Sequence, residues 1–414
     1  MVHDTRRSLA RKSLSCACLL LALSAMAPLL HAGDDFMRWL DELREEAASQ
    51  GISQATLDAA LADVRPLERV IELDRRQPEF TETFWNYLDK RVTAGRIHKG
   101  RQLLARHRAL LGEVERKFGV PPRYLVAFWG LETNFGAYLG SFPTVDALVT
   151  LAFDPRRGEF FRAQVLDALR IIDQGHVVAE NMKGSWAGAI GQLQFLPSTF
   201  LAHALDGNGD GTKDVWRNLH DVFHSGGNYL QNIGWRRGER WGREVLLPAN
   251  FPWEDARLDF RKPLAYWSAQ GVRRADGSPL PVADMSGAIV LPQGHDGPAF
   301  LVYGNFDVIM KWNRSIHYAL SVGILADRIA GGGRVLHGRG ADNRRLTRQL
   351  TQELQQRLNA RGFDAGDPDG IPGRLTRKAV RAYQLQAHLP ADGHPSVALL
   401  EHLRQAGVTP SAPF

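Results

Sequence analysis

The sequence predicts a mainly α-helical protein with a small β-rich insertion and a second, small helical domain at its C-terminus. Three observations predict this fold class. Apolar residues recur at helical spacing in the stretches 35–118 and 306–330. Between Pro252 and Tyr303, glycines and prolines interrupt short apolar runs at a density that helices do not tolerate. A glycine-rich segment then separates residues 347–406, which again show helical spacing.

Length and composition limit the number of domains and the class of protein. A chain of 414 residues exceeds one comfortable hydrophobic core, so two or three domains are expected. With 44% hydrophobic and 23% charged residues, the composition is that of a globular protein and not of a disordered one. The net charge of +6 suits an acidic polymer as partner, which could be nucleic acid, an anionic membrane surface or anionic cell wall. A basic protein with no electrostatic partner fits the same charge.

Residues 1–32 have the pattern of an export signal. An apolar run, Leu14–Leu30, follows a positive head and ends just before Ala32, a small residue that precedes polar ones. The run is short and contains Ser24 and Pro28, which argues against a transmembrane anchor. We expect cleavage after Ala32 and a periplasmic mature protein. The basic residues of the head are Arg6, Arg7, Arg11 and Lys12.

Both cysteines, Cys16 and Cys18, lie inside this segment. The mature chain would therefore have no disulfide framework, and packing alone must hold the fold. Neither cysteine has a leucine three positions before it, so we expect simple export and no lipid anchor.

The remaining chain divides into three parts. The larger helical domain is expected to span residues 33–330, and its β-rich insertion covers about 252–303. Residues 331–346 contain several glycines and predict a flexible linker. Residues 347–406 predict a separate small domain.

One predicted helix presents a carboxyl group on an apolar face. Pro121 and Pro122 suit its first turn, and Asn134 and Gly136 suit its end. Glu132 shares a face with apolar residues three and four positions apart. Partial burial disfavours the charged form of a carboxyl and raises its pKa. A general acid for a glycosidic oxygen needs this raised pKa, because it must start protonated. On spacing alone, a glutamate that merely pairs with an arginine fits as well. The apolar residues of this face are Leu125, Phe128 and Trp129.

A second segment, Gly184–Ser198, favours the functional interpretation. Its glycines would let a saccharide approach the backbone, and the amides of Gln192 and Gln194 could bind hydroxyl or acetamido groups. A tight helix-packing turn would need only the glycine and alanine residues.

Together, Gly130–Gly136 and Gly188–Ser198 resemble the lytic murein transglycosylases of the B type, and the similarity extends from about Phe36 to Ala330. The resemblance implies a lysozyme-like helical fold with Glu132 at the cleft. It also implies non-hydrolytic cleavage between N-acetylmuramic acid and N-acetylglucosamine, which leaves a 1,6-anhydromuramoyl end. No organic cofactor is implied.

The resemblance also implies substrate-binding residues around the scissile sugar. Trp312 stands where some family members carry a tyrosine, and the aromatic residues of the set could equally belong to the core. The implied set is Tyr87, Ser185, Gln194, Phe195, Tyr229, Trp312, Asn313 and Tyr318.

A single carboxylate predicts an unusual reaction path, because most glycosidases use a pair. Asp146 and Asp154 lie nearby in sequence, but each suits a helix terminus or a turn. With Glu132 alone, the expected path is protonation of the glycosidic oxygen while the substrate's acetamido group stabilises C1. Glu132 then deprotonates the C6 hydroxyl, which attacks C1 within the same sugar and replaces water.

The segment 206–214 has the first half of an EF-hand-type calcium loop, with oxygen side chains at alternate positions. Arg217 stands where the usual closing glutamate would be, so Asp221 is expected to close a longer loop, as the resemblance implies. The ion would be a structural Ca²⁺, for which Na⁺ could substitute. A turn with no ion is the alternative. The expected ligands are Asp206, Asn208, Asp210, Thr212 through its carbonyl, and Asp221.

The C-terminal stretch resembles the three-helix peptidoglycan-binding module of cell-wall enzymes. The resemblance rests on Leu354–Gln356, Asp369–Gly373, Ala379–Gln384 and Asp392–Gly393. Asp369 suits a turn and Thr376 suits the cap of the second helix. Such a module would raise the local concentration of an enzyme on an insoluble polymer.

Three hypotheses remain: a lytic transglycosylase, a lysozyme-like hydrolase, and a non-catalytic wall-binding protein. The expected partner is the glycan strand of peptidoglycan, with peripheral association with wall or membrane and a monomeric state. The export signal and the lack of a concentrated basic segment argue against nucleic acid.

Overall fold

The computed structural model describes residues 27–76 and 82–406. Most of the predicted export signal lies outside these residues, and only positions 27–32 enter the first turns of helix α2 (Ala27–Ser49). Cleavage after Ala32 stays a prediction. Within the described residues, no helix is both long and apolar enough to span a membrane.

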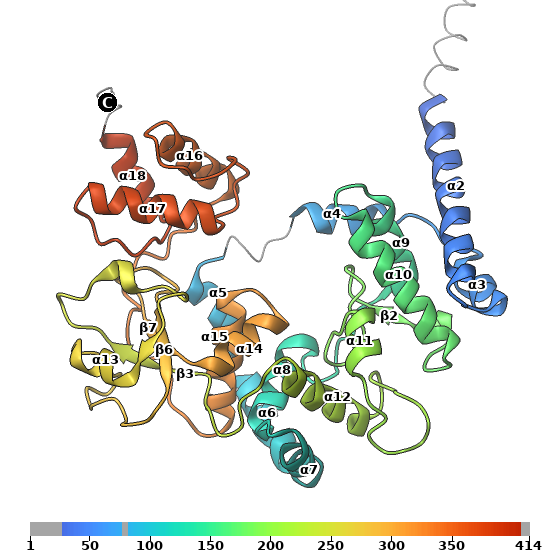
Figure 1. Ribbon diagram of the computed structural model, residues 1–414, viewed down its shortest axis with the longest axis horizontal. Coiled ribbons are helices and arrows are strands. Elements are labelled where there is room, and N and C mark those ends of the chain that lie inside the picture. The colour runs from blue at the N-terminus through green and yellow to red at the C-terminus, as the bar shows by residue number, and fades with distance from the viewer. Residues whose placement is uncertain (1–26, 77–81, 407–414) are drawn as a thin grey trace, which may run out of the picture.

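The predicted mainly helical fold is confirmed (Figure 1). Helices precede and follow a small antiparallel sheet, and a second group of helices ends the chain. Among the described residues, the helices before the sheet are α2, α3 (Gln54–Leu61), α4 (Glu68–Arg76), α5 (Phe84–Arg91), α6 (Ala94–Arg106), α7 (Arg108–Phe118), α8 (Pro122–Thr133), α9 (Thr144–Phe153), α10 (Gly158–Asp173), α11 (Pro197–His203) and α12 (Leu219–Asn232), with a 3-10 turn at Ala179–Asn181.

Helix α8 is the centre of the larger domain. It begins with Pro122 in its first turn and ends at Asn134, whose left-handed φ of 51° stops the helix. Nearly all of its side chains are buried, because it packs against α6, α7 and α15 (Ile316–Ile329). A short two-stranded ribbon pairs β1 (Phe142–Pro143), which follows α8, with β2 (Lys183–Gly184), which follows α10.

The β-rich insertion is a five-stranded antiparallel sheet in the order β4-β6-β7-β3-β5. It has a small core of its own around the fully buried rings of Trp267 and Tyr303. Strand β3 begins before the stretch that is rich in glycine and proline. The bounds are β3 (Gly242–Leu246), β4 (Lys262–Pro263), α13 (Leu264–Ala269), β5 (Arg273–Arg274), β6 (Ser286–Val290) and β7 (Ala299–Val302), with a 3-10 turn at Trp253–Asp255 before β4.

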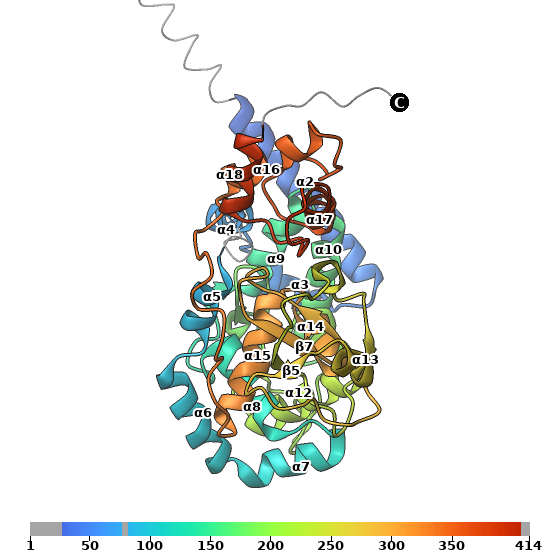
Figure 2. The ribbon, with the colours of Figure 1, turned by 90° about the vertical axis from the view of Figure 1, so that its left-hand side faces the viewer.

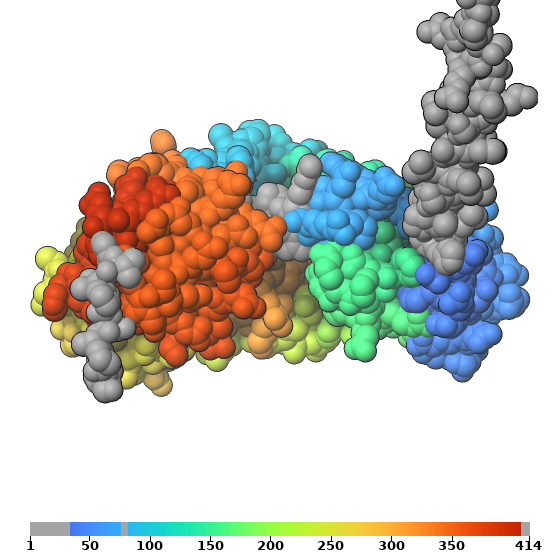
Figure 3. Space-filling model, turned by 90° about the horizontal axis from the view of Figure 1, so that it is seen from above, coloured from blue at the N-terminus to red at the C-terminus, as the bar shows by residue number. Residues whose placement is uncertain are grey.

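After the sheet, α14 (Gly304–Trp312) and α15 return to the main core. The C-terminal module then contains α16 (Arg348–Asn359), α17 (Arg374–Gln386) and α18 (Val397–Gln405) around a separate core. Seen from above, the module (red) lies against the sheet region, at the opposite end of the molecule from α2 and α3 (Figure 3).

Of two predictions about the module, one is confirmed and the other is wrong. The turn at Asp369 forms as predicted, because its carboxylate accepts the N–H of Ile371 at 2.8 Å. The predicted cap at Thr376 is wrong, since α17 already begins at Arg374. Thr376 is buried, and its hydroxyl donates to the carbonyl of Ala365 at 3.2 Å.

The connection between α15 and α16 is held against the larger domain. We call residues 334–345 the strap. Figure 2 shows this chain running from the end of α15 past α6 and α5 to the module. Glu244 accepts the backbone N–H groups of Leu336 and His337 at 2.9 and 2.8 Å. The flexible linker stays a prediction; in this structure, polar backbone groups of the segment have partners on the domain that it crosses.

Candidate active site

Glu132 lies in the last turn of α8, at the end of the apolar face that the sequence predicted. Its Oε1 atom accepts the indole N–H of Trp312 at 3.0 Å and a short hydrogen bond from the hydroxyl of Tyr318. Trp312 ends α14 and Tyr318 lies in the first turns of α15. The consecutive helices α14 and α15 thus meet α8, which lies about 180 residues earlier in the chain, at one carboxyl oxygen.

Tyr318 is buried. Burial raises the pKa of its phenol well above 10, and the neighbouring charge of Glu132 raises it further. The hydroxyl therefore stays protonated at every physiological pH and remains a donor to Glu132. Ser315 fixes the start of α15 by accepting the N–H of Tyr318 at 3.3 Å.

Aromatic rings line the site beside Glu132. Trp312 stacks on Phe128, with ring centres 4.3 Å apart. Its other neighbours are Tyr229 at 5.0 Å and Phe195 at 5.5 Å. The structure thus brings three of the predicted aromatic residues together next to the carboxyl. Of these rings, only Trp312 and Tyr229 are partly exposed, and flat apolar surfaces of this kind suit the faces of sugar rings; Phe128 and Phe195 are buried beside them.

His203, which the sequence did not indicate as a site residue, ends α11, and its ring centre lies 4.8 Å from that of Tyr229. Burial lowers its pKa, so its ring is neutral at neutral pH. In the sequence, only its place shortly after Pro197 and Ser198 marked it.

The glycine- and glutamine-rich segment forms a compact loop beside this wall. The hydroxyl of Ser185 accepts the N–H of Ala189 at 3.0 Å. Gln194 has a left-handed φ of 51°, and its amide donates to the carbonyls of Leu139 at 3.1 Å and Gly191 at 3.0 Å. Both predicted residues therefore shape the loop. Each side chain is only partly buried and keeps an exposed portion.

Gln192 does not have the saccharide-binding role that its sequence context suggested. Its side chain is buried, its Oε1 accepts the indole N–H of Trp129 at 2.6 Å, and its Nε2 donates to the carbonyl of Trp216 at 3.0 Å. Its own carbonyl accepts the hydroxyl of Thr133 at 2.8 Å. Gln192 thus joins the loop to the end of α8, directly beside Glu132.

Two further predicted site residues lie on the elements around Trp312 and Tyr318. Tyr87 is buried, its ring packs against His317 at 5.8 Å, and it belongs to the charge environment of the Tyr318 phenol. Asn313 follows α14, and its side chain accepts the N–H of Ser315 at 3.0 Å. Tyr87 therefore lies beside His317 and Tyr318, and Asn313 holds the turn that carries Trp312 to Tyr318.

The two other carboxylates near in sequence are engaged elsewhere. Asp146 lies in the first turn of α9, where burial raises its pKa. Asp154 ends α9 and pairs with Arg156, which lowers the pKa of the carboxyl. These are the helix-terminus and turn positions that the sequence predicted.

The predicted calcium loop is ordered by its own backbone. Asp206 accepts the N–H groups of Gly209 and Gly211 at 2.6 and 2.7 Å, and these bonds lower its pKa. Asp221 is fully buried and accepts two backbone N–H groups of the loop; burial raises its pKa, and the charges of Asp206 and Asp210 raise it further.

Oxygen donors of this kind suit a hard cation such as Ca²⁺. Each ionised carboxylate also has more lone pairs than the hydrogen bonds named above occupy. Within residues 27–76 and 82–406, however, no group of three or more histidine, cysteine, aspartate or glutamate side chains is arranged to hold a metal. The donor chemistry fits, whereas binding would require the side chains of the loop to move closer together.

Comparison with known proteins identifies the chain. Residues 35–327 match the family model of the transglycosylase SLT domain. The chain belongs to this family of lytic transglycosylases. Residues 347–403 of this transglycosylase match the model of a peptidoglycan binding domain, which accounts for the three-helix module.

Among solved structures, the transglycosylase is similar to SltB3 from Pseudomonas aeruginosa, determined in complex with NAG-anhNAM-pentapeptide. The two are 46% identical, with a TM-score of 0.86 over 89% of this chain and 99% of that one. Slt35 from Escherichia coli, determined in complex with calcium, is 27% identical, with a TM-score of 0.61 over 71% of this chain and 92% of that one. Membrane-bound lytic murein transglycosylase B from Escherichia coli is 27% identical over 68% of this chain and 79% of its own length.

Proposed function

We propose that this lytic transglycosylase cleaves the β-1,4 bond between N-acetylmuramic acid and N-acetylglucosamine in peptidoglycan and forms a 1,6-anhydromuramoyl end. Glu132 acts first as general acid and then as general base. The observation that carries the proposal is the pair of donors on Oε1 of Glu132, set in a wall of aromatic rings. SltB3, solved with both NAG-NAM-pentapeptide and NAG-anhNAM-pentapeptide, supports it.

In the first step, Glu132 gives its proton to the glycosidic oxygen, and the bond from C1 to that oxygen breaks. Negative charge develops on the carboxyl as the proton leaves. Preorganised donors aimed at a developing charge stabilise the transition state, and the N–H of Trp312 and the hydroxyl of Tyr318 are such donors. The acetamido group of the substrate stabilises the positive charge at C1.

In the second step, the C6 hydroxyl of the same sugar attacks C1, and Glu132 takes up the hydroxyl proton. The enzyme returns to its starting state, and no water is consumed. Because the attacking hydroxyl belongs to the bound sugar, its effective concentration exceeds that of any water. A second protein carboxylate is therefore not required, in contrast to the usual glycosidase pair.

Digestion of purified peptidoglycan tests this proposal, with mass analysis of the products from wild type and Glu132→Gln. We expect products lighter by one water than hydrolysed fragments, and no products from the variant. Products of hydrolysed mass would instead identify a lysozyme-like hydrolase. Cleavage by neither protein, with binding retained, would identify a non-catalytic wall-binding protein.

We also propose a structural Ca²⁺ in the loop 206–221, held by Asp206, Asn208, Asp210, the carbonyl of Thr212 and Asp221. The convergence of negative charge on buried Asp221 supports it, because an internal cation would relieve this repulsion. The calcium complex of Slt35 supports it as well. When bound, the ion would hold the loop that leads into α12, which carries Tyr229.

The pattern of residues 1–32 supports export to the periplasm, where peptidoglycan lies. We propose a mature chain that begins at Gly33 and binds glycan strands through its C-terminal module. N-terminal sequencing of protein from the periplasmic fraction tests the cleavage. A start at Met1 in the cytoplasmic fraction would contradict it.

A further inference from the structure

The strap binds to one face of α5 through hydrogen bonds and an ion pair. The indole N–H of Trp85 donates to the carbonyl of Gly338 at 2.9 Å. Arg339 lies over the ring of Trp85, 4.2 Å from its centre, and pairs with both oxygens of Asp89 at 2.7 and 2.8 Å. This pairing lowers the pKa of the Asp89 carboxyl, so the contact persists as an ion pair. Two successive strap residues thus bind two turns of α5.

A buried amide joins the strap to the start of the same helix. Gln293 accepts the N–H of Phe84, the first residue of α5, at 3.0 Å. Its own Nε2 donates to the carbonyl of Asp342 at 2.6 Å. Gln293 is only 6% exposed, so each of these backbone groups would lose its partner if the amide were removed.

The opposite face of α5 leads to the catalytic carboxyl. The rings of Phe84 and Tyr87 each lie 5.8 Å from the ring of His317. The next residue, Tyr318, donates to Glu132, and the charge environment of its phenol includes Tyr87. Helix α5 therefore lies between the strap and the residues that hold Glu132.

An eight-residue helix is too short to be stable without packing on its faces. We propose that the strap is a positioning element of the active site, with Trp85 and Gln293 as its positioning residues on the domain. The strap holds α5, α5 holds His317 and Tyr318, and these hold Glu132. This inference rests on the proposed function, because it concerns the placement of the same carboxyl.

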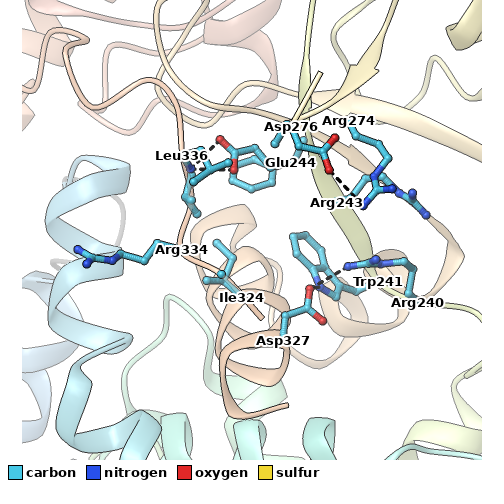
Figure 4. Close-up of a pocket in the computed structure, with 14 residues that line it drawn as sticks. Arg240, Trp241, Arg243, Glu244, Arg274, Asp276, Ile324, Asp327, Arg334 and Leu336 are labelled. Carbon is cyan, nitrogen blue, oxygen red and sulfur yellow. Dashed lines mark hydrogen bonds and ion pairs between the residues drawn. The ribbon is translucent and has the colours of Figure 1, made fainter. Parts of the chain in front are cut away.

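Further contacts show that the strap is docked along its length. Figure 4 shows a pocket lined by Trp241, Glu244 and Asp327. Glu244 accepts the N–H of Leu336 there, drawn as dashed lines, while Arg334 points away from the pocket.

Beyond the strap, the module itself contacts the sheet region, where buried Asp392 accepts the backbone N–H and the ring nitrogen of His295 at 2.8 and 2.9 Å. A loose tether between two independent domains would need neither contact. Loss of the strap would therefore change catalysis itself, and not only wall binding.

Two glycines of the strap give a matched pair of variants. Gly338 has a φ of +76°, and a Cβ there would overlap the backbone of Gly297 and Pro298. Gly340 has nothing within 4 Å of an added Cβ. Gly338→Ala should therefore displace the strap from the domain, whereas Gly340→Ala should leave it docked.

The test measures kcat and KM of the full chain on a soluble, peptide-free glycan oligomer. The indole resonance of Trp85, assigned from the spectrum of Trp85→Phe, reports docking. We expect Gly338→Ala to shift that resonance and lower kcat about tenfold, with KM changed by less than about twofold. Gly340→Ala should match wild type. A shifted resonance with wild-type kcat would overturn the inference.

If Gly338→Ala does not fold, Arg339→Ala takes its place, with Arg339→Lys as the variant that keeps the charge next to Asp89. We expect the alanine variant to lose kcat and the lysine variant to recover part of it. Equal kcat in wild type and Arg339→Ala would also overturn the inference. Failure of the proposed function is distinct, because wild type itself would then release no anhydro product.

Discussion

Trp312 donates its indole N–H to Oε1 of Glu132 across 3.0 Å. The indole is also stacked on Phe128, so its ring is held even without this hydrogen bond. Packing and hydrogen bonding at Trp312 can therefore be separated by substitution.

Trp312→Phe should keep the stacked ring and remove the donor. A hydrogen bond to a charged group contributes about 1.5–3 kcal/mol, so kcat should fall roughly 10- to 100-fold. Trp312→Tyr supplies a hydroxyl and should recover part of the loss. Steady-state kinetics on a soluble glycan oligomer measure both, and an unchanged kcat in the phenylalanine variant would refute the donor role.

Gln192→Ala should destabilise the fold without weakening substrate binding. The substitution leaves the indole N–H of Trp129 and the carbonyl of Trp216 without their buried partner, at a cost of about 2–3 kcal/mol. Denaturant unfolding measures this loss. Gln194→Ala is the comparison, because its side chain is partly exposed in the loop and should alter KM instead. A raised KM with wild-type stability for Gln192→Ala would contradict this prediction and indicate that Gln192 binds the saccharide.

Calcium should raise the thermal midpoint of the protein. A ligand that binds only the native state at about 100 times its Kd stabilises it by about 2.7 kcal/mol. The midpoint in millimolar Ca²⁺ should therefore exceed that in chelator, and Asp206→Asn should lose the difference. Asp276→Asn, in an exposed turn of the sheet region, is the control. Identical midpoints with Ca²⁺ and with chelator would exclude a calcium site.

The protein should lose stability in mild acid through His317. Burial, together with the nearby charge of Arg377, lowers the pKa of this ring from 6.5 to about 4, against the opposing effects of the carbonyl of Pro292 and the charge of Glu82. Below pH 6.5 the ring binds a proton in the unfolded chain but not in the native protein. The contribution of His317 to the free energy of unfolding is therefore complete above pH 6.5 and is lost as the pH falls towards 4, by about 1 kcal/mol per pH unit.

Urea unfolding between pH 7 and pH 4.5 measures this loss in wild type and in His317→Gln, which should show a shallower decline. His394 also has a pKa lowered to about 4 by burial, so His394→Gln should reduce the slope as well. Parallel curves for all three proteins would contradict the assignment to these rings.

The sequence predicted correctly those features that depend on local patterns. Helix α8 begins and ends within two residues of the predicted signals, because prolines and a left-handed asparagine act within one turn. The aromatic wall followed from a resemblance to a known family. The roles of Gln192 and Thr376 could not be predicted, since each depends on partners that only the folded chain brings near.

The strap shows the same limit more clearly. Its glycines predicted flexibility, and glycine does permit it. In the structure, Arg339 pairs with Asp89, a residue 250 positions earlier in the chain. No window of sequence contains both partners, so local composition could describe the strap but not its docking.

The docked module also bears on where the enzyme cuts. A module on a loose tether would leave the cleft free to sample many positions along a strand. With the module seated against the sheet through His295 and Asp392, a glycan strand bound to the module would lie at a fixed separation from Glu132. The length of the released fragments would then follow from that separation.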